Sequence, residues 1–138
     1  AAFHIPHGFA NALLISQVIR YNASDCPAKQ CAFPQYRFPN AKAAYASFAE
    51  NLGLKGKTDD EKVDNLIKAI EELKKEIGVP ASIKEWGISK EDFTEAMKTL
   101  PTLAFDDQCT GSNPRYPLIE EIEKLYWLAY EGNYNFNL

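Results

Sequence analysis

The residues of this chain best suited to chemistry are its two histidines, His4 and His7, which lie three positions apart near the start. Imidazole is the commonest metal ligand among protein side chains and titrates near neutral pH. Spacing alone favours a simpler interpretation, in which both are partly buried polar residues hydrogen-bonded near a helix start. A catalytic metal needs three protein ligands and an open position. If His7 binds a metal, the other ligands must therefore come from outside this sequence.

The other reactive residue types form no recognisable site. The three cysteines, at positions 26, 31 and 109, match neither zinc nor redox spacing, and we expect reduced thiols. Adjacent Asp106 and Asp107 could act as acid and base, but carboxylates in a polar turn are mostly solvated or capping groups. Neither a glycine-rich phosphate loop nor a nucleophile motif is present. We therefore assign no catalytic and no cofactor-binding residue within the chain.

Composition and charge exclude several classes of function. Hydrophobic residues make up 46% and charged residues 25%, as in soluble globular proteins. The net charge of -4, without a lysine or arginine cluster, argues against binding to nucleic acid or to an anionic membrane surface. No apolar run approaches the ~20 residues that span a bilayer, and no secretion signal is visible. We expect a cytoplasmic protein, and the absence of an initiator methionine suggests a fragment of a larger one.

The first expected helix runs from residue 8 to about residue 20. Its apolar residues lie nearly all round the helical wheel, which predicts burial on most sides and something further to cover its second face. The segment 21–39 contains Pro27, Pro34 and Pro39, which remove amide donors and fix φ. We predict an irregular or short-helical connection there.

Amphipathic patterns predict the remaining elements. A helix over 41–52 would follow Asn40 as its N-cap, and a second, over 58–77, opens with a capping box from Thr58 to Glu61.

A further helix would begin after Ser89 and end at Pro101, a polar turn would occupy 104–115, and a last helix would have Pro117 as its first residue. No alternating strand pattern occurs. The sequence predicts one all-α domain over 1–138, a helical bundle of about five or six helices.

Two separated motifs carry a resemblance to a known family. They are FHIPHGFANA at residues 3–12, followed by VIRYN at 18–22, and FDDQCTGSNPRYP at residues 105–117. Together they resemble the C-terminal helical part of the iron-containing alcohol dehydrogenases. The DDQCTG form is most similar to the alcohol dehydrogenase half of bifunctional aldehyde-alcohol dehydrogenases. The likeness covers essentially the whole chain, with both motifs in order and at the right distance.

The resemblance implies specific roles for individual residues. The Pro-His-Gly histidine of the family binds the metal, and that role carries over to His7. The other ligands, an aspartate and two histidines, would lie upstream of residue 1, as would the α/β domain that binds NAD(H). His4 and Cys109 would lie at or near the substrate pocket. The run from Asn113 to Arg115 would be structural, fixing the turn into the last helix.

The implied reaction is reversible hydride transfer between NAD(H) and a short aldehyde or alcohol such as acetaldehyde, with Fe²⁺ as Lewis acid. Zinc is the alternative metal. The implied partners are the upstream remainder of the enzyme, the small substrate and further copies in a homo-oligomer or filament; the chain alone would be inactive. A different class of function stays open: a free-standing helical interaction module without catalysis, whose exposed apolar first helix binds a partner.

Overall fold

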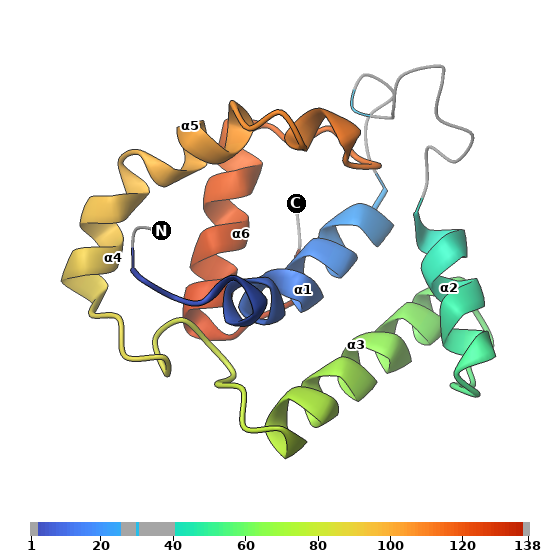
Figure 1. The fold of residues 1–138 in the computed structure, drawn as a ribbon. Helices are drawn as coiled ribbons and strands as arrows, with labels where there is room; N and C mark the ends of the chain where they lie inside the picture. Colours follow the sequence, from blue (N-terminus) through green and yellow to red (C-terminus); the bar gives the residue numbers. More distant parts are fainter. Residues whose placement is uncertain (1–2, 26–29, 31–40, 137–138) are drawn as a thin grey trace.

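The computed structural model describes residues 3–25, 30 and 41–136 of the chain, and this part contains six α-helices, one short 3-10 helix and no strand. The all-α class and the expected number of helices are confirmed. Helix α1 (His7–Ala23) runs through the middle, with α2 (Lys42–Asn51) and α3 (Asp59–Glu76) on one side (Figure 1). On the other side lie α4 (Lys90–Met97), α5 (Leu100–Phe105) and α6 (Ile119–Glu131). No helix in the described ranges is long and apolar enough to cross a membrane.

Helix α1 starts directly after Pro6 and is longer than expected. The prediction of an irregular connection from residue 21 was wrong for its first three residues, since the helix continues to Ala23. No proline interrupts this part, and the side chains of Tyr21 and Asn22 are buried in polar contacts with the C-terminal part of the chain. Most of the predicted connection, at 26–29 and 31–40, lies outside the described residues.

Burial of α1 differs from the expectation of a helix enclosed on most sides. Leu13, Ile19 and Tyr21 are buried against the other helices, whereas Phe9 and Ile15 are 38% and 40% exposed. The exposed residues of the helix are limited to positions 7–9, 11 and 15, and Phe9 still contacts the Trp86 ring, with the two ring centroids 4.9 Å apart.

The α2 and α3 pair follows its predicted pattern closely. Thr58 caps α3 by accepting a hydrogen bond from the Glu61 N–H at 3.2 Å, as the capping box predicts. The Glu61 carboxylate reaches one residue further back than expected and accepts from the Lys57 N–H at 2.6 Å. The predicted N-cap of α2, Asn40, lies outside the described residues, and Ala41 occupies the N-cap position.

Two prolines play other roles than the sequence suggested. Ser89 caps α4 as predicted, but that helix ends at Met97, and Pro101 opens the separate helix α5 instead of ending α4. A proline has no N–H to lose in a first helical turn, so it starts a helix as readily as it stops one. Pro117 was predicted as the first residue of the last helix, yet α6 begins at Ile119 with Leu118 as N-cap.

Candidate metal and substrate site

His7 is the first residue of α1, and its side chain is exposed. The helix presents Asn11 one turn later on the same face, and the Asn11 amide Nδ2 lies 3.1 Å from His7 Nε2. His7 therefore stands on a rigid element with one ring nitrogen already in a defined contact.

His4 lies in the segment before α1 and is exposed, with a φ of 53°. This left-handed conformation is uncommon for a residue with a Cβ. Within the described ranges, no group of three or more histidine, cysteine, aspartate or glutamate side chains could hold a metal ion. His7 is thus a candidate for a single ligand, and the described part of the chain does not complete a metal site around it.

Cys109 lies in the turn between α5 and the 3-10 helix η1 (Thr110–Ser112), and its thiol is free and exposed. The Cys109 N–H donates to the Asp107 carboxylate at 2.8 Å, so Asp107 shapes the turn, as the capping interpretation of these acidic residues predicts. Beside this turn is a hollow of about 480 Å³, lined by Asn11, Val18, Tyr21, Ala104, Cys109, Thr110, Asn113, Pro117, Ile122 and Leu125.

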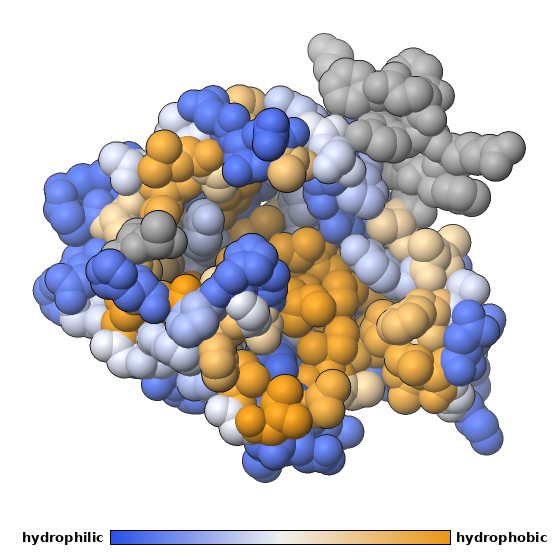
Figure 2. Space-filling view, viewed as in Figure 1, coloured by the Kyte–Doolittle hydropathy of each residue, from blue (hydrophilic) through white to orange (hydrophobic). Residues whose placement is uncertain are grey.

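The hollow brings together the two motifs that are far apart in the sequence. Asn11 and Val18 come from α1, whereas Cys109 and Thr110 come from the turn after α5. Figure 2 shows apolar side chains gathered in the centre of the face that carries the start of α1. Because Asn11 also contacts His7, the candidate metal ligand adjoins the same hollow as Cys109.

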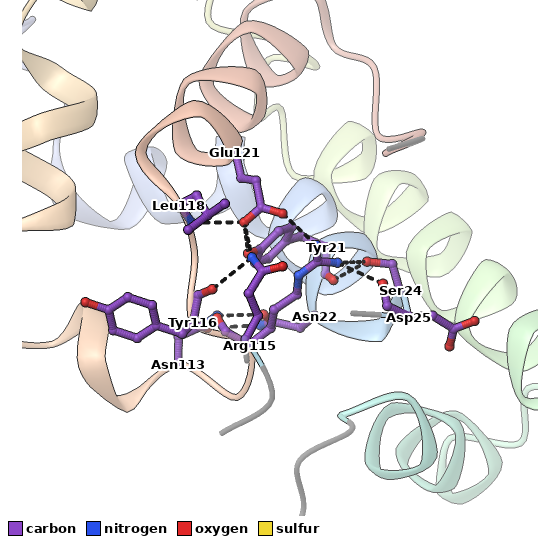
Figure 3. Close-up of polar contacts among 10 residues, drawn as sticks. Tyr21, Asn22, Ser24, Asp25, Asn113, Arg115, Tyr116, Leu118 and Glu121 are labelled. Atoms are coloured by element: carbon purple, nitrogen blue, oxygen red, sulfur yellow. Dashed lines mark hydrogen bonds and ion pairs between the residues drawn. The ribbon is translucent and has the colours of Figure 1, made fainter. Parts of the chain in front are cut away.

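A buried polar cluster joins these elements (Figure 3), and two of its members, Tyr21 and Asn113, also line the hollow. Arg115 is 1% exposed, and its guanidinium lies 2.6 Å from the carboxylate of Glu121, which is 8% exposed. The guanidinium also stacks over the Tyr21 ring at 4.2 Å and donates to Ser24 Oγ at 2.5 Å. The cluster joins the C-terminal end of α1 to the N-terminal end of α6.

Glu121 is the hub of this cluster. Its carboxylate accepts hydrogen bonds from the Tyr21 hydroxyl at 2.7 Å, the Gln30 amide at 2.6 Å and the Leu118 N–H at 2.9 Å. Burial alone would raise the pKa of Glu121, but these hydrogen bonds and the charge of Arg115 outweigh it and lower the pKa below its ordinary value. Burial and the hydrogen bond to Glu121 raise the pKa of Tyr21 far above its ordinary value. At neutral pH the cluster therefore combines an ionised carboxylate with a neutral phenol.

Asn113 completes the connection through its amide. It forms a reciprocal pair with Asn22, with N···O distances of 3.1 and 2.7 Å, and it donates to the Arg115 carbonyl at 2.5 Å. The predicted structural role of the run from Asn113 to Arg115 agrees with these contacts. Sequence reasoning missed Tyr21 and Glu121, although a glutamate three residues after the Leu118 N-cap is a recognisable capping signal.

Comparison with known proteins identifies one family. The model of the Fe-containing alcohol dehydrogenase family, C-terminal, matches residues 1–130. The chain is 52% identical over 132 residues to the bifunctional aldehyde-alcohol dehydrogenase AdhE of Escherichia coli (strain K12), covering 94% of this chain and 15% of that protein.

Two further relatives are a second aldehyde-alcohol dehydrogenase and a butanol dehydrogenase. The aldehyde-alcohol dehydrogenase of Clostridium acetobutylicum is 51% identical over 123 residues, covering 89% of this chain and 14% of the relative. The NADPH-dependent butanol dehydrogenase of Clostridium saccharobutylicum is 35% identical over 132 residues, covering 96% of this chain and 30% of the relative. The chain thus spans less than a third of the length of each of these relatives.

Proposed function

Since this chain belongs to the Fe-containing alcohol dehydrogenase family, we propose that it is the helical, metal-site part of an NAD(H)-dependent enzyme that interconverts short-chain aldehydes and alcohols. One observation carries the proposal: the start of α1 holds His7 and Asn11 in contact, and Asn11 shares a hollow with Cys109. The proposed metal ligand and the proposed substrate space therefore adjoin one another.

The donor chemistry of His7 fits a divalent metal. Its imidazole is exposed, and Nε2 lies 3.1 Å from the Asn11 amide. Fe²⁺ is the proposed ion and Zn²⁺ the alternative, because imidazole accepts both. When bound, the ion supplies Lewis-acid polarisation of the substrate oxygen, next to which NAD(H) exchanges a hydride. His7 contributes one ligand, and we assign the others and most of the NAD(H) contacts to an upstream part of the same enzyme.

The hollow beside Cys109 is the proposed space for the substrate. Its walls combine apolar side chains such as Val18 and Leu125 with the polar groups of Asn11 and Thr110, a mixture typical of small-molecule sites. His4 is a weaker candidate for the pocket, because it precedes α1 and is not among the lining residues.

The exposure of Ile15 supports the expected partner. Its side chain is 40% exposed on α1, and an upstream part of the enzyme would cover it. Self-association into a homo-oligomer or filament stays a prediction from the family resemblance.

The test is the metal content of a longer polypeptide that contains this chain and its upstream part. After anaerobic purification, His7→Ala is expected to lose most of its bound iron or zinc, because removing one of a few ligands weakens a site strongly. His4→Ala is the matched control and is expected to retain the metal. Elemental analysis measures both variants and also identifies the ion.

The competing function is a helical interaction module without catalysis. Apolar side chains such as Phe48 and Leu52, which are 55% and 56% exposed on and directly after α2, favour this alternative. Unchanged metal content in His7→Ala would contradict the metal-site proposal and leave the interaction module.

A further inference from the structure

A second space in the molecule is smaller than the hollow at Cys109 and almost entirely apolar. It has a volume of about 150 Å³. Its floor consists of three core side chains, Leu13, Ile83 and Phe93, which are at most 6% exposed. Half-buried residues such as Ala10 and Leu14 line its sides. We call this space the apolar recess.

The chemistry of the apolar recess selects an uncharged hydrocarbon group. Tyr126 is the only lining residue with a polar side chain, and burial raises the pKa of its phenol, which therefore stays neutral at neutral pH. An ion would lose its hydration there without gaining a partner. An apolar cavity of about 150 Å³ holds one benzene molecule, so the recess has room for up to about six carbons.

The recess lies beside the hollow along the same three helices. Helices α1 and α5 both pack against α6 (Figure 1). On each helix a residue of the recess lies one turn from a residue of the hollow: Leu14 and Val18 on α1, Leu100 and Ala104 on α5, and Tyr126 and Ile122 on α6. Four residues of an α-helix span about 6 Å, so the two spaces are neighbours.

We propose that the apolar recess receives the hydrocarbon tail of the aldehyde or alcohol while the reacting end occupies the hollow, which favours substrates of about four to six carbons over acetaldehyde. The inference rests on the proposed function, in which the hollow is the substrate space. The recess also lies on the His7 side of α1, because Ala10 and Leu14 follow His7 by three and seven residues and so share its helix face. An extended chain of several carbons reaches from one space into the other.

Chain-length dependence is the first test, made on the longer polypeptide with straight-chain aldehydes from acetaldehyde to octanal. Each methylene group that leaves water for apolar surroundings contributes about fourfold to binding. The value of kcat/KM is therefore expected to rise about fourfold per added carbon and to level off near hexanal. A flat or falling series would overturn the inference.

Two variants change the recess in opposite directions. Ala10→Leu fills it and should lower the ratio of kcat/KM for hexanal to kcat/KM for acetaldehyde by more than about tenfold. Leu14→Ala enlarges it and should move the optimum toward octanal, a gain that damage to the fold does not produce.

The matched control for Ala10→Leu is Ala12→Leu. Ala12 lies on the same helix but is not among the residues that line either space. The control adds the same side-chain volume and should keep the hexanal to acetaldehyde ratio. Equal ratios in the two leucine variants would overturn the inference.

Direct binding to the metal-free chain is a measurement that needs no activity. Hexan-1-ol should shift the methyl resonances of Leu13 and Ile83 in ¹H–¹³C spectra, because these side chains form the floor of the recess. Ethanol at the same concentration should shift them far less, and Ala10→Leu should abolish the response to hexan-1-ol. Unshifted methyl resonances in the parent would overturn the inference.

The failure of the proposed function is distinguishable from the failure of this inference. If His7→Ala of the longer polypeptide retains its metal, the proposed function fails, whatever binds in the recess. If His7→Ala loses its metal while the chain-length series is flat, the proposed function stands and the recess is not a tail site. Binding of hexan-1-ol to the chain together with a flat series would mean that the upstream part of the enzyme fills the recess, which also overturns the inference.

Discussion

The pairing of Arg115 with Glu121 is the residue-scale feature on which the shape of the site depends most. Both side chains are nearly inaccessible to water, so neither charge can be solvated if its partner is removed. We expect Arg115→Met to reduce the free energy of unfolding by about 3–5 kcal/mol, as for other broken buried ion pairs. Urea denaturation of the chain measures this change.

A double variant measures the interaction energy between Arg115 and Glu121. Arg115→Met with Glu121→Met removes both charges, and it should lose less stability than the sum of the two single variants, because no unpaired charge stays buried. Additive losses would contradict a direct coupling between the two side chains.

Acid sensitivity is a second prediction at the residue scale. The folded chain lowers the pKa of Glu121, so the unfolded chain, with a glutamate pKa of about 4.3, binds the proton more tightly. The stabilisation from Glu121 is therefore fully present above that pH and is lost as the pH falls through the lower folded pKa. Glu121→Gln should be less stable than the parent at pH 7, and the difference should narrow below about pH 4. A pH-independent difference in urea midpoints would contradict the assigned charge state.

At the scale of single elements, the sequence predicted a helix end well where the residues that determine that end are its neighbours in the chain. The α3 boundaries follow from neighbouring residues, Thr58 and Glu61 at one end and Gly78 beyond the other, and these were predictable. Pro101 has the same local signal whether it ends one helix or begins the next, so α5 was missed. The extension of α1 to Ala23 depends on contacts of Tyr21 and Asn22 with residues about 90 to 100 positions away. No local pattern contains that information.

The same distinction applies to the candidate site. Spacing alone left His7 as one of two ordinary histidines, and only the family resemblance singled it out. The hollow shared by Asn11 and Cys109 depends on how α1 packs beside the turn after α5, which the sequence pattern does not specify.

Two glycines at helix ends offer a matched pair for testing element boundaries. Gly132 ends α6 at a φ of 71°, and a Cβ there would lie 3.2 Å from the Ala81 carbonyl oxygen. Gly78, beyond α3, has a similar φ of 77°, but a Cβ there would meet nothing within 4 Å among the described residues. In both alanine variants the left-handed backbone conformation lowers the free energy of unfolding by about 1–2 kcal/mol. Gly132→Ala should cost about 1–3 kcal/mol more, because backbone cannot move aside as a side chain can.

Thermal or urea unfolding of the two variants measures this difference. Equal losses in Gly132→Ala and Gly78→Ala would show that the contact of Gly132 with the segment before α4 is relieved at no cost. That result would contradict the close packing of the end of α6 against residues 81 and 82.

At the scale of the whole molecule, the described part of the chain contains a hydrophobic core but no group of three or more side chains that could hold a metal ion. Its buried clusters join α1 to helices on both sides. In the proposed function this scaffold orients one ligand and one wall of the pocket, and the upstream part supplies the rest of the site.

The isolated 138 residues are therefore expected to show no NADH-dependent reduction of acetaldehyde, even with iron or zinc supplied. A single imidazole holds a divalent ion weakly, and the sequence contains no glycine-rich dinucleotide-binding motif. The longer polypeptide, assayed under the same anaerobic conditions, is the positive control, and its His7→Ala variant should fall to the level of the isolated chain. Metal-dependent turnover by the 138 residues alone would contradict the division of the site between two parts of the enzyme. Turnover that survives in His7→Ala of the longer polypeptide would contradict the assignment of the ligand itself.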